Sequence, residues 1–166
     1  FNSAGPLEEY FRAQIAGDGE ERAALQKRAD ELGLADRVGF LGWLDPADKP
    51  AFFNSLDVMC FTSEWDMQGI VILESLAWRK ALIGTAIDGP SSCYTDGVTA
   101  LVVPPADPPA LAAALRRLHD DPALRRRLAG NGRQVAIERY SNEAIAELLD
   151  RSLRRLVADA RQGGAR

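Results

Sequence analysis

Short apolar runs alternate with helical stretches along the first two thirds of the chain. Segment 10–16 has the composition of a strand and leads directly into the glycine turn 17–19. An Ala-, Leu-, Glu- and Arg-rich stretch follows as far as residue 32, and Leu25, Ala29 and Leu32 recur on one helical face. Asp18 and Glu21 have the spacing of a capping box. The pattern predicts a strand, a tight turn and a helix.

The same alternation continues to residue 103. Four further runs predict strands, at 38–41, 57–61, 81–85 and 99–103. A helix between the first two would carry Phe52, Phe53 and Leu56 at core spacing. The apolar run 69–77 fits a strand or a buried helix, and its place between two strands favours the helix. Nearly continuous apolar strands are typical of a parallel sheet covered on both faces.

Helices are predicted for the rest of the chain, about 107–160. Asp107-Pro108 and Asp121-Pro122 each combine an N-cap acid with proline at the first helical position. The last helix, after 140–142, has one apolar side: Ile145, Leu148, Leu149, Leu153, Leu156 and Val157. We therefore expect a single α/β domain over residues 1–166, a doubly wound parallel sheet with C-terminal helices, whose ligands bind beyond the carboxyl ends of the strands.

Charge, hydropathy and cysteine content limit the classes of function that fit this chain. The 166 residues carry a formal charge of −4, which argues against a nucleic-acid partner. No apolar run reaches the roughly 20 residues that cross a bilayer, and residues 1–9 lack signal-peptide order, so a cytoplasmic protein is expected. The two cysteines and single histidine form no metal-binding pattern, and we expect reduced thiols and no metal site.

Two segments carry candidate chemistry. The glycines of turn 17–19 allow close approach of backbone to an anion, although a plain tight turn capped by Asp18 explains them equally well. Glu64, Asp66 and Glu74 surround the start of the apolar helix 69–77. A carboxylate among Ile, Val and Leu requires a polar partner, unless Glu74 lies on a solvent-facing stripe.

Carboxylates suit ligands with many hydroxyl groups, because an ionised acid accepts hydrogen bonds from adjacent hydroxyls. Sugars and riboses offer such hydroxyl pairs. A helix beginning near Gly69 would also direct free N–H groups at a phosphate. Sugar, phosphate and ribose would then share one crevice.

The chain from Ile15 to Pro105 resembles the C-terminal domain of family 4 glycosyltransferases (glycosyl transferases group 1), retaining enzymes with the two-domain GT-B fold. The resemblance rests on four stretches in the family's order and spacing. They are Ala16-Gly17-Asp18-Gly19, Phe40-Leu41-Gly42, Thr62 to Gly69 with Glu74-Ser75, and Asp96-Gly97 through Val103-Pro104-Pro105.

The resemblance implies a role for each matching position. Asp66 would contact the donor sugar and Glu74 the nucleotide ribose, while backbone amides at Gly69 and Ile70 would meet the donor. The main chain of Phe40 and Leu41 would form the base pocket. Independently of the resemblance, the turn residues Gly17, Asp18 and Gly19 are candidate donor-binding residues, and the amides of Gly17, Gly19 and Gly69 are candidates to approach the phosphates. No cofactor or obligatory metal is implied; the donor, a UDP- or GDP-sugar, is a substrate.

Departures from the family pattern are also informative. The first acid is aspartate where the family has glutamate, which shortens its reach by one methylene, so Glu64 is an alternative sugar contact. Asp88-Gly89 replaces Gly-Gly, and Ser92 occupies a place where an acid is common. The family's first strand and helix, with their Arg and Lys, have no counterpart in residues 1–9. The acceptor-binding N-terminal domain is absent too, so a fragment is expected.

Two further questions follow from the sequence. A non-catalytic nucleotide-sugar-binding or interaction module derived from the family is the alternative function. A response-regulator-like domain is not favoured, because Asp57 and Lys80 do not stand in the required order.

The basic segment, with Arg125-Arg126-Arg127, Arg151 and Arg154-Arg155, would suit peripheral contact with anionic lipids, or simply a solvated helix face.

Overall fold

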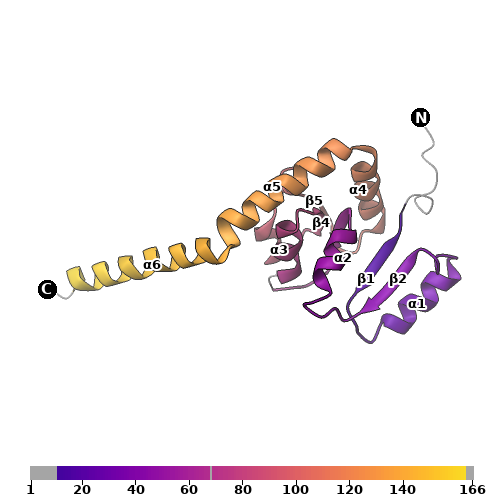
Figure 1. The fold of residues 1–166 in the computed structure, drawn as a ribbon, viewed down its shortest axis with the longest axis horizontal. Helices are drawn as coiled ribbons and strands as arrows, with labels where there is room; N and C mark the ends of the chain where they lie inside the picture. Colours follow the sequence, from indigo (N-terminus) through magenta and orange to yellow (C-terminus); the bar gives the residue numbers. More distant parts are fainter. Residues whose placement is uncertain (1–10, 68, 164–166) are drawn as a thin grey trace. The chain divides into compact units, whose positions relative to one another are not determined.

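The computed structural model describes residues 11–67 and 69–163, and the chain divides into two compact units, residues 1–55 and 56–166. In the first unit, β1 (Ala13–Ala16) pairs in parallel with β2 (Val38–Gly42), and α1 (Arg22–Glu31) connects the two strands (Figure 1). Helix α2 (Lys49–Ser55) completes this unit. The predicted strand, turn and helix are present, but the strand begins at Ala13; residue 10, where the sequence pattern placed its start, lies outside the described residues.

The start of α1 corrects one prediction. The helix begins at Arg22, its N-cap is Glu21, and no side chain caps it. Residues 19–22 form a turn in which the Arg22 amide donates to the carbonyl of Gly19 at 3.1 Å, so Asp18 lies too far ahead to cap the helix. Of the three residues predicted on one face, only Ala29 is buried; Leu25 and Leu32 are about half exposed.

The second unit contains three parallel strands in the order β3 (Val58–Phe61), β4 (Ala81–Thr85) and β5 (Ala100–Val103). Between them lie α3 (Ile70–Ala77) and the short 3-10 helix η2 (Pro90–Cys93). Run 69–77 is therefore a helix, as its place between strands predicts. The described strands form two parallel sheets, β1-β2 and β3-β4-β5, and confirm the α/β class.

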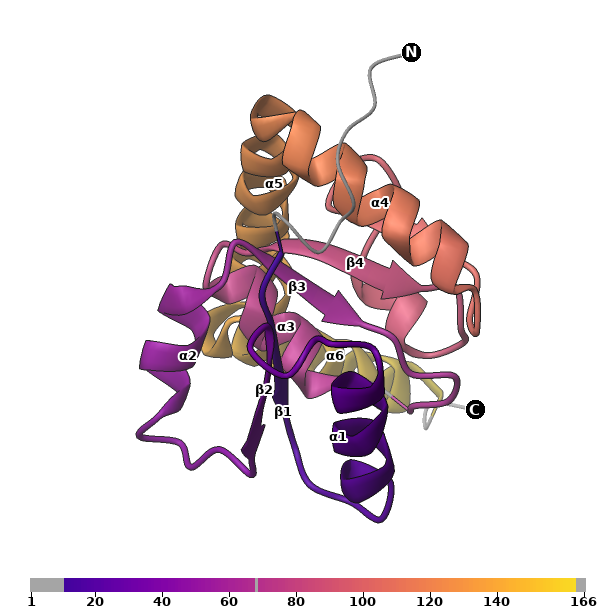
Figure 2. The same ribbon diagram turned by 90° about the vertical axis from the view of Figure 1, so that its right-hand side faces the viewer.

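Both faces of the β3-β4-β5 sheet are covered, as the continuous apolar strands predict. Figure 2 shows α4 on one side of β3 and β4 and α3 on the other. Ala81 and Ile83 of β4 pack with α4 and the first half of α5, whereas Leu82 packs with α3, η2 and the last part of α5. Every residue of β4 is consequently buried.

The helical segment has the predicted caps. Helices α4 (Pro108–Asp120) and α5 (Pro122–Tyr140) begin after Asp107 and Asp121, whose carboxylates accept from the amides of Ala110 (2.9 Å) and Leu124 (2.8 Å). Helix α6 (Asn142–Gly163) contacts α5, and its apolar side chains from Ile145 to Val157 are 47–65% exposed. Within the described ranges, no helix combines the length and apolarity that a bilayer crossing requires.

Candidate functional site

The N-terminal end of α3 at Gly69, together with the loop 64–67 before it, is called the α3 mouth here, and it follows the end of β3. Strand β3 stops at Phe61, and Gly69 is the N-cap of α3, with φ 62° and ψ 63°. A methyl group on Gly69 would lie 2.7 Å from the Cδ1 of Ile72 and 3.2 Å from the Cζ of Phe61. Only glycine avoids both the left-handed strain and this clash, so Gly69 lets the chain enter the helix directly above the end of the strand.

Asp66 holds this mouth together. Its Oδ1 accepts a hydrogen bond from the Gly69 amide at 2.7 Å, and the residue is half-buried. The Gly69 amide is therefore engaged within the chain, and the idea that it faces a donor phosphate stays a prediction. A bond from an amide to a carboxylate is stronger than one between neutral groups, and it fixes the loop.

Glu74 lies one turn into α3. Ile72, Ser75 and Leu76 form the buried face of the helix. Ile70 and Glu74 are four residues apart and share another face, where Ile70 is 68% exposed and Glu74 is half-buried. Glu74 thus sits at the border of the core, and the full desolvation suggested by its apolar neighbours in sequence is not reached.

A hollow of about 560 Å³ opens beside the α3 mouth. Two loops line it, each following the carboxyl end of a strand: 64–67 after β3 and 86–89 after β4. Glu64 is exposed here, and Trp65 and Met67 are each 80% exposed. Parallel α/β sheets bind ligands at this end of their strands. Two of the three predicted acids, Glu64 and Asp66, therefore line a hollow at a place suited to a ligand, whereas Glu74 is not among its lining residues.

The two loops are tied to each other through Thr85, the last residue of β4. Its hydroxyl donates to the Ser63 carbonyl at 2.7 Å, and its own carbonyl accepts from the Tyr94 hydroxyl at 2.5 Å. Burial and the neighbouring Cys93 raise the pKa of Tyr94, so the phenol keeps its proton for this bond. The sequence pattern did not identify Thr85 or Tyr94 as residues of the site. The position of Thr85 at the end of a predicted strand was the one feature that could have indicated its role.

Gly89 brings the second loop against the first. Its φ is 83°, and a methyl group there would lie 2.4 Å from the Met67 carbonyl oxygen and 3.2 Å from that of Asp66. No side chain fits this approach. The acidic segment, residues 63–67, is thus held in place by the hydrogen bond from Thr85 to Ser63 and by the close contact with Gly89.

The glycine turn of the first unit is organised by Arg22. The Gly17 amide donates to the Gly42 carbonyl at 2.7 Å, and the Gly19 amide donates to Asp18 Oδ1 at 2.9 Å. The guanidinium of Arg22 approaches Asp18 Oδ2 at 3.4 Å and donates to the carbonyl of Phe40 at 3.3 Å. Arg22 is a residue that sequence reasoning missed, and it links the turn to β2.

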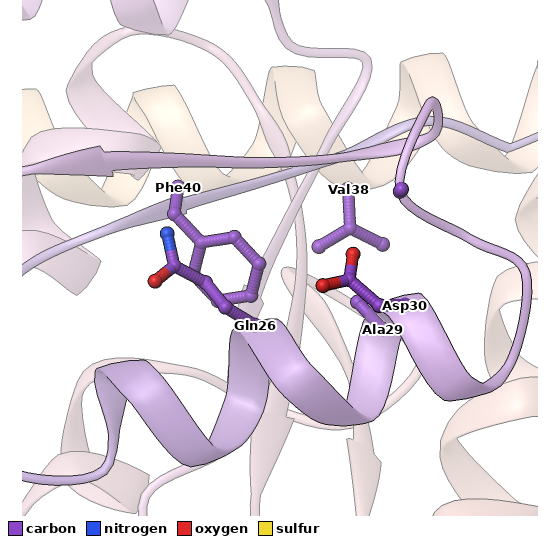
Figure 3. A pocket seen from close by; sticks show the side chains of 6 residues that line it. Gln26, Ala29, Asp30, Val38 and Phe40 are labelled. Atoms are coloured by element: carbon purple, nitrogen blue, oxygen red, sulfur yellow. The ribbon is translucent and has the colours of Figure 1, made fainter.

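Phe40 and Leu41 face opposite sides of β2. The side chains of Phe40 and Val38 point towards α1, where they line a hollow of about 360 Å³ with Gln26, Ala29 and Asp30 (Figure 3). Leu41 is 42% exposed. The Phe40 carbonyl accepts from Arg22, so the main chain predicted to meet a base already has a partner.

The predicted site residues fall into two groups. One group lies on a continuous segment formed by the β3–α3 loop and the first turns of α3: Glu64, Asp66, Gly69, Ile70 and Glu74. The first-unit residues, Gly17, Asp18, Gly19, Phe40 and Leu41, lie on the turn after β1 and on β2, which the Gly17–Gly42 bond joins.

The free cysteines, Cys60 and Cys93, lie outside these two groups. Burial in β3 raises the pKa of the Cys60 thiol to about 11. The Cys60 thiol is therefore protonated at neutral pH, the form that is the weaker nucleophile.

Comparison with known proteins extends these observations. Residues 6–135 match the family Glycosyl transferases group 1. The lipopolysaccharide core biosynthesis glycosyltransferase LpsD of Rhizobium meliloti is 40% identical over 133 residues, 80% of this chain and 38% of LpsD. The alpha-D-kanosaminyltransferase of Streptomyces kanamyceticus is 36% identical over 135 residues, 81% of this chain and 35% of that enzyme. The chain thus spans little more than a third of these relatives.

Two solved structures share the fold. Sucrose-phosphate synthase from Thermosynechococcus elongatus superposes with a TM-score of 0.76 at 29% identity, over 88% of this chain and 38% of that one. Alr3699/HepE from Anabaena, solved in complex with UDP-glucose, gives 0.75 at 27% identity, over 84% and 40%. From its motifs, its α/β architecture and these matches, the chain belongs to the glycosyl transferases group 1 family.

Proposed function

We propose that this chain is the donor-binding domain of a retaining glycosyltransferase that transfers a sugar from a UDP- or GDP-sugar to a cellular acceptor. The observation that best supports this proposal is the arrangement at the α3 mouth. Asp66 accepts a hydrogen bond from the Gly69 amide, Glu74 follows about one helical turn later, and a hollow lies beside them at the ends of the strands. Family membership and the UDP-glucose complex of the similar Alr3699/HepE support the donor class.

Asp66 and Glu74 are the acids proposed to hold the donor, on its sugar and its ribose respectively. An ionised carboxylate accepts several hydrogen bonds, so the bond from Gly69 is compatible with a second bond from a sugar hydroxyl. The bond to Gly69 also fixes the orientation of the Asp66 carboxylate before the ligand arrives. Such preorganisation reduces the entropy lost on binding.

Several wider features remain part of the proposal. We propose that another part of the whole protein binds the acceptor, and that the reaction needs no metal ion. A cytoplasmic location is proposed, with peripheral membrane contact through the arginines of α5 and α6. Arg154 bonds Asp150 at 2.7 Å and Arg127 bonds the Gly97 carbonyl at 3.2 Å, as a solvated, acid-laced helix face would also show.

Calorimetric titration of the full chain with UDP, GDP, UDP-glucose and GDP-mannose tests the proposal. One nucleotide series is expected to bind, and Glu74→Ala should weaken it about tenfold or more, since a hydrogen bond to a charged group contributes roughly 1.5–3 kcal/mol. Glu147→Ala, in the exposed part of α6, is the matched control. Absence of heat with every nucleotide would favour the non-catalytic module, and unchanged binding by Glu74→Ala would remove the ribose assignment.

A further inference from the structure

The hollow beside the α3 mouth is lined by both large apolar and acidic side chains. Trp65 and Met67 are each 80% exposed, and they alternate along the chain with the carboxylates of Glu64 and Asp66. The second loop adds Asp88, also exposed. At about 560 Å³, the hollow falls within the roughly 300–1,000 Å³ of small-molecule sites.

The charges in this lining decide which part of a donor fits here. Three carboxylates, Glu64, Asp66 and Asp88, line the hollow, and they would repel a diphosphate. They are suited instead to accept protons from hydroxyl groups, because an ionised acid offers only acceptor sites. The favoured occupant is thus an uncharged part with many hydroxyls.

Trp65 supplies the complementary apolar surface. A hexose ring carries hydroxyls at its rim and a patch of C–H groups on its face. An indole ring offers a large, stiff apolar surface with little conformational entropy to lose, which suits it to cover such a patch. Trp65 and Glu64 are consecutive residues, so the two kinds of contact come from one short segment.

The backbone that carries Trp65 is fixed from three sides. Thr85 donates to the carbonyl of Ser63, Asp66 accepts from the amide of Gly69, and Gly89 packs closely against the carbonyl groups of Met67 and Asp66. An exposed side chain on a fixed backbone is the arrangement expected of a recognition residue.

We propose that Trp65 is a specificity-determining residue of this domain, which packs its indole ring against the donor hexose while Glu64 accepts hydrogen bonds from the hexose hydroxyls. The proposal rests on the proposed donor-binding function and names the residues that read the sugar rather than the nucleotide. Asp66, proposed above to contact the same sugar, also positions this segment through its bond to Gly69.

The experiment separates the sugar contact from the nucleotide contact. Calorimetry on the full chain compares UDP with UDP-glucose, and GDP with GDP-mannose, for the parent and three variants: Trp65→Ala, Trp65→Phe and Glu64→Gln. Trp43→Ala is the matched control, because Trp43 is also 80% exposed but lies after β2. Circular dichroism checks that each variant is folded.

Trp65→Ala should lower affinity for the nucleotide sugar about tenfold, equivalent to about 1.4 kcal/mol, and leave affinity for the bare nucleotide unchanged. Trp65→Phe should keep most of the affinity, and Glu64→Gln should weaken only the nucleotide sugar. The nucleotide sugar should also change indole fluorescence more than the nucleotide does, and Trp65→Phe should abolish that difference.

The outcomes distinguish the two proposals. If the parent chain binds no nucleotide, the proposed function fails and this inference fails with it. If the parent binds the nucleotide sugar and Trp65→Ala binds it equally well, or loses affinity for the bare nucleotide to the same extent, the sugar platform is overturned while donor binding stands.

Discussion

Gly89→Ala tests whether the close approach of two backbone loops sets the geometry of the acidic segment. The added methyl group would lie 2.4 Å from the Met67 carbonyl oxygen, whereas ordinary contacts begin at 3.4 Å. The loops must therefore separate by about 1 Å, a displacement large enough to disrupt a preorganised site. The φ of 83° and ψ of −81° add strain of roughly 1–3 kcal/mol for any residue with a side chain.

Gly97→Ala provides the matched control. Gly97 also has a positive φ, 67°, but a methyl group there meets nothing within 4 Å. This substitution carries the conformational penalty of roughly 1–2 kcal/mol without the clash. A loss in Gly89→Ala that exceeds the loss in Gly97→Ala by more than the difference in backbone strain consequently reports the approach of residue 89 to Met67.

Two measurements decide the outcome. In urea unfolding, Gly89→Ala should lose more free energy of unfolding than Gly97→Ala. In titration with UDP-glucose, Gly89→Ala should bind about tenfold or more weakly, because moving one acid out of hydrogen-bond range removes roughly 1.5–3 kcal/mol. Equal stability of the two variants, together with parental affinity in Gly89→Ala, would refute the reasoning.

Two further predictions concern the core. Gly132→Ala should be less stable in urea than Gly130→Ala by about 1–3 kcal/mol, because its methyl group would lie 2.6 Å from the buried Leu76 Cδ2 while a methyl at residue 130 meets nothing within 4 Å; equal stabilities would contradict the α3–α5 packing. The thiol of Cys60, with a pKa of about 11, should react slowly with iodoacetamide at pH 8. Because this pKa is higher in the folded protein than in the unfolded chain, the contribution of Cys60 to the free energy of unfolding should be lost as the pH rises from about 9 to 11. Mass spectrometry and pH-dependent urea unfolding check this, and a smaller decline in Cys60→Ala is expected.

Local patterns were enough to predict most elements of the fold. Capping by Asp107 and Asp121 involves residues three apart, and the order of strands and helices follows from apolar periodicity. The capping box at Asp18 failed because a turn delays α1 to Arg22, and sequence spacing alone does not show where a helix begins.

The candidate site likewise has one part that the sequence predicts and another part that only the tertiary structure shows. Asp66, Gly69 and Glu74 lie within nine residues of one another, so their grouping at the start of α3 is a consequence of the sequence itself. Only the tertiary structure decided that Thr85 bonds Ser63, that Gly89 reaches Met67 and that Trp65 stays exposed beside a hollow. These contacts join loops from neighbouring strands, and their distances depend on the β3–β4 register and on packing over the whole sheet, which no local pattern encodes.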